Sequence, residues 1–192
     1  MTPLHNKPNP HHPMGRLARL LSQWSVVLAL GVLAACVSTR PPLPTVADVN
    51  LERFMGDWYV IAHIPTFIER DAYNALERYD LAPNGTVATT FTFRQGAFDG
   101  PVKRYQPTGF VVDGLHHATW GMQFIWPIKS EFLIAGLDDH YQQTIIARTA
   151  RDYVWIMART PSLAESDYVK LVDDVRAMGY DVTKLRRVPQ RW

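Results

Sequence analysis

The middle of this 192-residue chain is a series of short apolar segments separated by turn signals, and this series limits the fold more than any other feature. Eight segments have the length and composition of β-strands, at the regular spacing that is typical of all-β barrels and sandwiches. They cover residues 57–63, 76–81, 86–94, 102–112, 118–126, 131–137, 141–148 and 153–159. Pro83-Asn84-Gly85, between the second and third, predicts a hairpin turn.

The periodicity changes to that of a helix after the last of these segments. Ser162-Leu163-Ala164-Glu165 predicts a capping box, in which the serine and glutamate side chains bond the first free amides. Apolar residues then recur at helical spacing in a single stripe, which predicts a helix packed on the outside of the β structure. The stripe consists of Val169, Val172, Val175 and Met178, and Gly179 ends it. We expect residues 181–188 to return as a short final strand. The predicted fold class is therefore all-β: an eight-stranded up-and-down antiparallel barrel with one C-terminal lateral helix.

The N-terminal part has the layout of a secretory signal, with basic residues, an apolar run at 25–35 and small residues before Cys36, the chain's single cysteine. The run is shorter than the roughly 20 residues that span a bilayer. The segment Leu33-Ala34-Ala35-Cys36 resembles the lipobox of bacterial lipoproteins, in which the thiol is acylated and anchors the protein to the membrane. Val37 after the cysteine, rather than aspartate, favours the outer membrane by resemblance to the sorting pattern of Gram-negative lipoproteins. A buried cysteine at a helix end is the structural alternative.

The chain accordingly divides into a lipoprotein signal peptide at 1–35, a lipidated proline-rich tether at 36–47 and one folded domain at 48–192. Three of the 20 basic residues precede Cys36, and no acidic residue does, so 17 basic and 18 acidic residues remain after cleavage. The basic balance belongs to the signal, and we expect no nucleic-acid partner. With its one thiol acylated, the mature chain would have no internal disulfide.

Three ordered motifs resemble the conserved blocks of lipocalins. Gly56-Asp57-Trp58-Tyr59 is similar to the Gly-x-Trp-Tyr signature of the first strand, and Leu137-Asp138-Asp139-His140-Tyr141 to the turn between the sixth and seventh strands. The segment 153–161 is similar to the block whose arginine precedes the helix. With the lipobox, the chain resembles the bacterial outer-membrane lipocalins. The resemblance implies that Trp58 lies against Arg159 and closes one end of the barrel, with the guanidinium over the aromatic ring.

The resemblance also implies a cavity for one small ligand, since an eight-stranded barrel is just wide enough to hold one. Alternate residues of each strand face the barrel interior, and the large aromatic residues expected at these positions are the candidate ligand-binding residues. These candidates are Tyr79, Phe91, Phe93, Phe110, Trp120, Phe124, Phe132, Tyr141 and Trp155. Each of them could instead fill the core.

The loops after alternate strands should meet at the open mouth of the barrel. They carry both apolar residues and cations: Phe67, Ile68, Ala97, Phe98, Trp126, Pro127 and Ile128, and Arg70, Lys103, Arg104, Lys129 and Arg151. An apolar rim with cations suits an amphiphile with an anionic head, so a fatty acid, lysophospholipid or similar lipid is the expected ligand. Alternatively, the cations form a solvated face.

Two other functional classes compete with ligand carriage. Enzymatic activity is not expected, because the sequence has no recognisable catalytic or phosphate-binding motif and its cysteine is assigned to the lipid. His63 and His140 are the residues that a base or haem-ligand hypothesis would use, and the adjacent pair His116-His117 suits a metal poorly. We expect neither a metal nor a cofactor.

A structural or assembly lipoprotein with a filled barrel and a protein partner at the rim is the second alternative. Self-association into a homodimer is compatible with both readings.

Overall fold

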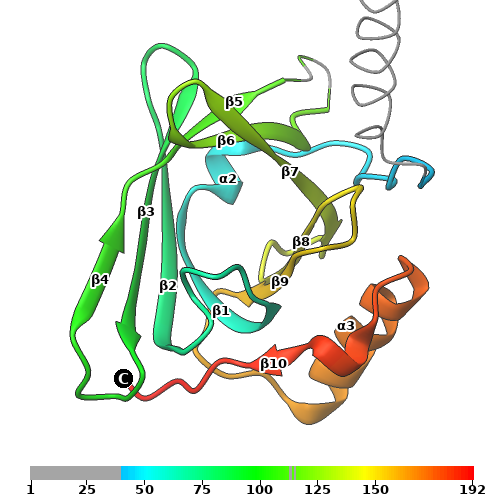
Figure 1. The fold of residues 1–192 in the computed structure, drawn as a ribbon. Coiled ribbons are helices and arrows are strands. Elements are labelled where there is room, and N and C mark those ends of the chain that lie inside the picture. Colours follow the sequence, from blue (N-terminus) through cyan, green and yellow to red (C-terminus); the bar gives the residue numbers. More distant parts are fainter. Residues whose placement is uncertain (1–39, 113, 115) are drawn as a thin grey trace, which may run out of the picture. The chain divides into compact units, whose positions relative to one another are not determined.

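Strands that pair mainly with their sequence neighbours curl into a closed barrel in the computed structural model, which describes residues 40–112, 114 and 116–192 (Figure 1). The signal peptide expected at 1–35 and Cys36, the expected lipid-anchor residue, lie outside the described residues. Among the described residues, no helix has both the length and the apolarity needed to cross a bilayer.

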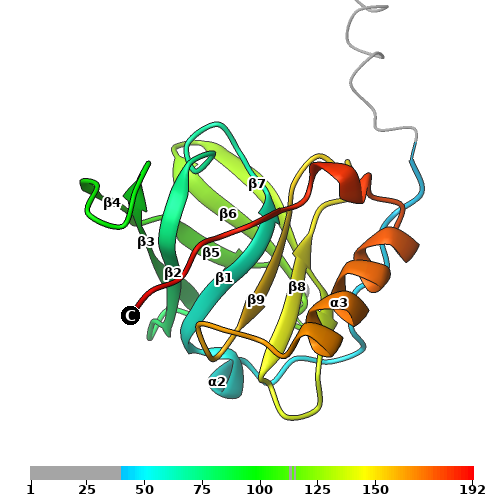
Figure 2. The ribbon, with the colours of Figure 1, turned by 90° about the horizontal axis from the view of Figure 1, so that it is seen from below.

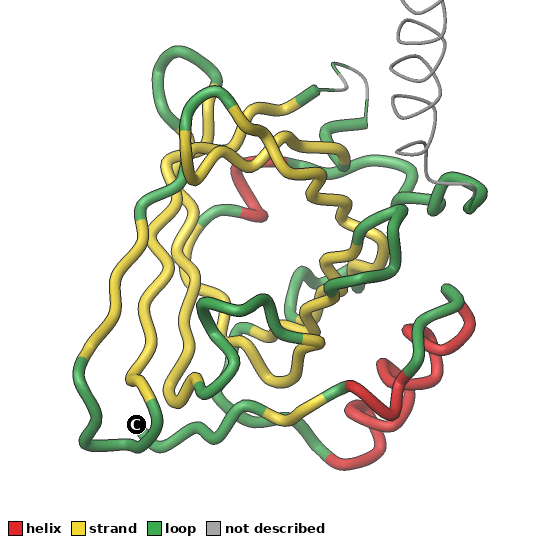
Figure 3. Tube along the Cα trace, in the orientation of Figure 1, coloured by secondary structure: helices red, strands yellow, loops and turns green. Residues whose placement is uncertain are grey.

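The elements follow the order expected for an up-and-down barrel (Figures 1 and 3). They are α2 (Leu51–Phe54), β1 (Gly56–Ile64), β2 (Ala72–Leu81), β3 (Thr86–Gln95), β4 (Val102–Tyr105), β5 (Thr108–Val111), β6 (Thr119–Ile125), β7 (Ile128–Leu137), β8 (Gln143–Ala147), β9 (Val154–Ala158), α3 (Glu165–Ala177), the 3-10 helix η2 (Val182–Lys184) and β10 (Arg186–Arg187). β1 pairs antiparallel with both β2 and β9, which closes the barrel. The predicted fold class is confirmed.

The fourth predicted strand, 102–112, is two strands in the structure. β4 pairs with β3 alone, whereas β5 pairs with both β3 and β6. Pro107 lies between them and has no amide hydrogen for the ladder, so the pairing is interrupted there. Its carbonyl oxygen still accepts a hydrogen bond from the Thr89 amide at 3.1 Å. β4 and β5 together occupy one of the eight positions around the barrel.

Helix α3 packs against the outer face of β8 and β9 (Figure 2). Leu171 and Val175 are its buried residues, while Val169 from the predicted stripe is 48% exposed. The predicted capping box is wrong: the helix begins at Glu165, and the N-cap residue is Ala164, which has no side chain able to cap. The start two residues later than expected leaves Glu165 exposed, and its carboxylate binds Arg187.

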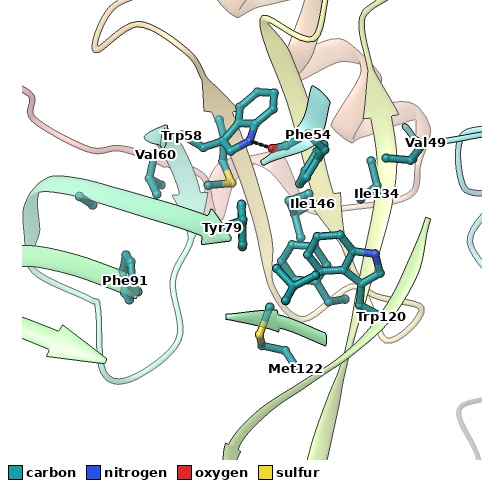
Figure 4. Packing of buried hydrophobic residues seen from close by; sticks show 14 of the residues in the cluster. Val49, Phe54, Trp58, Val60, Tyr79, Phe91, Trp120, Met122, Ile134 and Ile146 are labelled. Atoms are coloured by element: carbon teal, nitrogen blue, oxygen red, sulfur yellow. Dashed lines mark hydrogen bonds between the residues drawn. The ribbon is translucent and has the colours of Figure 1, made fainter. Parts of the chain in front are cut away.

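Two apolar clusters lie on the two sides of the barrel wall. One fills the closed half of the barrel interior around Trp58, Tyr79 and Trp120 (Figure 4). The other lies between the wall and α3. The expected tether at 36–47 is not wholly free of the domain: Leu43 is buried in the outer cluster, and the Val46 amide donates to the Ile134 carbonyl at 3.0 Å.

Candidate functional site

The closed end of the barrel is built around Trp58 and Arg159, the pair named by the sequence motifs. The Arg159 guanidinium lies 3.9 Å from the ring centroid of Trp58. It donates to four carbonyl oxygens, at 2.8 Å to Asp57 and Arg53, 3.1 Å to Phe54 and 3.2 Å to Tyr141. Burial lowers the pKa of Arg159 below its usual value. The indole nitrogen of Trp58 donates to the Phe54 carbonyl at 2.8 Å, so α2 is fixed beneath the barrel (Figure 4).

Aromatic rings form a floor above this closure. Tyr79 and Trp120 are fully buried and meet edge to face, with ring centroids 5.7 Å apart. Phe132 stacks on Trp120 at 5.1 Å. Phe54 packs between the floor and Trp58, with its ring centroid 5.0 Å from that of Trp58 and 5.7 Å from that of Tyr79. Tyr79 and Trp120, predicted as candidate ligand contacts, therefore support the cavity from below.

A cavity of about 400 Å³ lies above the floor. It falls within the size range of small-molecule sites, and its wall is mainly apolar. The lining residues come from strands all around the barrel and from the β1–β2 loop: Thr66, Phe67, Ile68, Glu69, Glu77, Phe91, Tyr105, Pro107, Met122, Phe124, Ile125, Ile128, Ser130, Glu131, Phe132, Ile146, Arg148, Tyr153, Trp155 and Met157. Phe91, Phe124, Phe132 and Trp155 are the predicted candidates that the structure brings together here.

The remaining predicted candidates lie elsewhere. Phe93 packs beside the cavity wall, with its ring centroid 5.2 Å from that of Phe91. Phe110 faces away from the interior, because its neighbour Gly109 occupies the inward position against Val87 and Trp120. The Lys129 ammonium lies 3.6 Å from the Phe110 ring centroid. The interior assignment of Phe110 had the wrong parity, because the inward side chains of this segment are the odd-numbered ones: Tyr105 and Pro107 line the cavity, and Gly109 follows them.

Tyr141 lies in the turn between β7 and β8, at the closed end of the barrel. Its hydroxyl accepts a hydrogen bond from the Asn50 amide at 2.9 Å, and the Arg53 guanidinium lies 4.0 Å from its ring centroid. It therefore supports the closure below the floor, because α2 rather than a ligand occupies its surroundings.

A buried carboxylate, that of Glu69, joins the β1–β2 loop to the barrel wall. It accepts hydrogen bonds from the Thr66 amide and hydroxyl at 3.0 Å each and from the indole of Trp155 at 3.2 Å. The His63 imidazole lies 3.7 Å away. Burial alone would raise the pKa of Glu69, but His63 and these donors outweigh it and lower that pKa below its ordinary value.

A second carboxylate, Glu77, lies one pleat above the floor on β2, because it shares a strand face with Tyr79. The Tyr79 hydroxyl donates to one oxygen of this carboxylate. Burial raises the pKa of Glu77 to about 7, with a smaller contribution from the charge of Glu69. Burial, together with the charge of Glu77, also holds the pKa of Tyr79 well above its ordinary value.

Glu131 is the third carboxylate of the cavity wall, and Arg148 is the one cation among the described lining residues. Glu131 accepts from the Thr149 amide at 2.6 Å and from its hydroxyl at 3.0 Å. Arg148 is paired with Asp152 at 3.3 Å and lies 5.4 Å from the ring centroid of Tyr153. The polar groups of the wall are thus predominantly acidic.

Large apolar side chains surround the open end. Phe67 on the β1–β2 loop is 82% exposed, and Trp126 in the β6–β7 turn is 83% exposed. Ile125 and Ile128, which flank that turn, are 71% and 66% exposed. These four residues are the apolar rim. A ligand that entered the cavity would pass between its two loops.

Two of the five cations predicted around this rim are engaged elsewhere, and the other three are exposed. Arg151 is bonded to the carbonyls of Pro41, Thr149 and Met178. Lys129 covers the outward-facing Phe110. Arg70, Lys103 and Arg104 are exposed. Phe98, placed at the mouth by loop order, packs edge to face on Tyr73 with ring centroids 5.0 Å apart.

The sequence reasoning missed the three carboxylates, because it searched the inward positions for apolar side chains. The signal for Glu77 was present: it stands two residues before Tyr79 and therefore shares its strand face. Glu69 had no such signal, since it lies in an irregular loop. Within the described ranges, no group of three or more histidine, cysteine, aspartate or glutamate side chains could hold a metal ion.

Comparison with known proteins matches residues 49–190 to the family model of the lipocalin-like domain. Temperature-induced lipocalin-1 of Arabidopsis thaliana is 28% identical over 80% of this chain and 86% of its own length. The outer membrane lipoprotein Blc of Escherichia coli K12 is 24% identical over 90% of this chain and 98% of its own length. Among solved structures, insecticyanin from the tobacco hornworm Manduca sexta has a TM-score of 0.63 at 14% identity, covering 79% of this chain and 86% of that one.

Proposed function

The chain belongs to the lipocalin family, and from that premise we propose that it binds one hydrophobic or amphiphilic molecule in the cavity above Tyr79 and Trp120. A fatty acid, a lysophospholipid or a similar lipid is the ligand class, and storage, transport or membrane maintenance is the role. The observation that carries the proposal is the mainly apolar cavity of about 400 Å³ whose opening is edged by the exposed apolar rim. Burial of apolar ligand surface supplies the binding free energy, about 25 cal/mol per Å².

We further propose that the protein is anchored to the outer membrane through acyl chains on Cys36. Four lines of support are the basic–apolar–small layout before Cys36, the residue Val37, the proline-rich segment after it and the similarity to the outer membrane lipoprotein Blc. Replacement of Cys36 by serine tests the anchor. We expect the parent chain to incorporate labelled palmitate and the variant to incorporate none, and equal incorporation in both would refute acylation of this thiol.

Native mass spectrometry of the full chain carrying Cys36→Ser, which removes the acylation site, tests ligand binding. We expect a bound small molecule that an added lipid displaces. Met122→Trp should fill the cavity and reduce occupancy at least tenfold, because Met122 lines it and is 5% exposed. Phe110→Trp is the matched control, since it enlarges a side chain on the outer face. An unliganded mass that a lipid panel leaves unchanged would instead favour the structural lipoprotein.

A further inference from the structure

The three wall carboxylates differ in how fully the protein satisfies them. The oxygens of Glu69 accept from Thr66 and Trp155, and those of Glu131 accept from Thr149. Glu77 receives one hydrogen bond, from Tyr79 to Oε2. Within the described part of the chain, its Oε1 atom has no hydrogen-bond partner, although Glu77 lines the cavity. Glu77 is half-buried, so this oxygen is open to the cavity and can accept a hydrogen bond from a ligand donor.

Rings beside Glu77 add a second preference for positive charge. Phe91 lies directly opposite Glu77 in the β2–β3 register, and Tyr105 is stacked on Phe91 with centroids 6.4 Å apart. Both rings line the cavity. The faces of aromatic rings attract cations, and this attraction is strongest where water is excluded.

Positive charge is scarce on the cavity wall. Arg148, the one lining cation that the structure describes, is paired with Asp152 through Nη1 at 3.3 Å, while its buried Nε has no hydrogen-bond partner. An anionic head placed in the cavity would meet the three carboxylates Glu69, Glu77 and Glu131, against which the wall sets the single cation Arg148. Juxtaposed like charges disfavour a partner strongly.

We propose that the cavity selects an amphiphile whose polar end is a protonated amine, which enters first and donates to Oε1 of Glu77. The hydrocarbon chain then extends past Met122 and Phe124 toward the apolar rim. Glu77 is the specificity-determining residue of this arrangement. The inference rests on the proposed function, and it narrows the ligand class from lipids in general to those bearing an amine.

Three probes of equal chain length test the head group: dodecylamine, dodecanol and dodecanoic acid. Each is titrated calorimetrically, below its aggregation concentration, into the full chain carrying Cys36→Ser at pH 7.5. We expect dodecylamine to bind at least ~10-fold more tightly than dodecanoic acid, with dodecanol between them, because a tenfold change needs only a modest difference in binding free energy.

A matched pair of variants on β2 tests the residue. Glu77→Gln should bring the affinity for dodecylamine to within about threefold of that for dodecanol. Asp80→Asn removes the same charge from the exposed outer face of the same strand, and it should leave the amine preference unchanged. An amine preference that survives Glu77→Gln in a folded protein would overturn the role of Glu77.

Comparing the three probes requires no substitution in the cavity. The comparison separates the proposed carrier function from the proposed preference for an amine. Dodecanoic acid binding as tightly as dodecylamine would overturn the head-group inference and leave the carrier function in place. Failure of all three probes to bind would overturn both.

Discussion

At the scale of single residues, Arg159 supports the barrel through contacts that no other side chain could make together. Its guanidinium covers the Trp58 ring and donates to four backbone carbonyls. We expect Arg159→Met to lower the free energy of unfolding by about 3 kcal/mol, because hydrogen bonds to a charged group contribute about 1.5–3 kcal/mol each but not additively. Urea unfolding followed by tryptophan fluorescence measures this. Arg78→Met, which breaks only exposed ion pairs, should leave the urea midpoint nearly unchanged.

Glu77 gives the stability of the unliganded protein a pH dependence. Burial raises its pKa to about 7 from an ordinary value of 4.5, so the folded state holds a proton that the unfolded state has lost between these values. The stabilising effect of this proton is complete below pH 4.5 and is lost as the pH rises through 7. Glu69 and Tyr79 are the titratable groups beside it.

Glu77→Gln removes this dependence and keeps an acceptor for Tyr79. We expect the variant to gain stability relative to the parent between pH 5 and pH 8, by up to about 3 kcal/mol for the full pKa difference. Chemical unfolding at the two pH values checks the sign. If Glu77→Gln instead lost stability relative to the parent as the pH was raised, Glu77 would be ionised in the folded parent at pH 5.

At the scale of elements, most strands could be predicted from the sequence because their alternation and turn signals are local. The break between β4 and β5 was not predicted, although the sequence contains Pro107 there. A long segment of alternating residues still has the pattern of one strand. Phe110 was placed inside for a separate reason: its size suggested an interior position, but the small Gly109 holds the inward one. Helix α3 was predicted from its apolar spacing, but its start was placed too early, because Ser162 and Glu165 fit the capping pattern without forming it.

The observed start of α3 leads to a stability prediction. Ala164 is the N-cap residue and has no side-chain hydrogen bond. Ala164→Ser should therefore stabilise the protein by about 1 kcal/mol, since serine at this position satisfies a free amide. Ser162→Ala should change stability by less than about 0.5 kcal/mol, because Ser162 lies before the cap. Thermal unfolding distinguishes these effects, and the reverse ranking would restore the capping box at Ser162.

At the scale of the whole molecule, the barrel separates a closed end held by Arg159 from an open end with an exposed apolar rim. Contiguous exposed apolar residues mark interaction surfaces, and a lipid-anchored carrier would present such a rim to the bilayer. The sequence motifs led to the closed end, because closure needs specific residue types. The chemistry of the cavity depended on which side chains face inward at each depth, and that required the register of every strand.

Trp126 in the apolar rim should promote contact with membranes. With the full chain carrying Cys36→Ser, we expect Trp126→Ser to reduce binding to phosphatidylethanolamine–phosphatidylglycerol vesicles several-fold in a flotation assay. Val169→Ser removes a large exposed apolar side chain from α3 instead, and it should have no effect. Equal losses in the two variants would show that binding follows general surface hydrophobicity and not the rim.

The central claim is that a single ligand occupies the cavity above Tyr79 and Trp120. A crystal structure of the full chain carrying Cys36→Ser, grown with dodecylamine, tests it most directly. The account predicts continuous density for one chain, with its nitrogen beside Glu77 and its methyl end near Phe67. Density for the amine only on the outer surface, with the cavity closed by its own side chains, would contradict it.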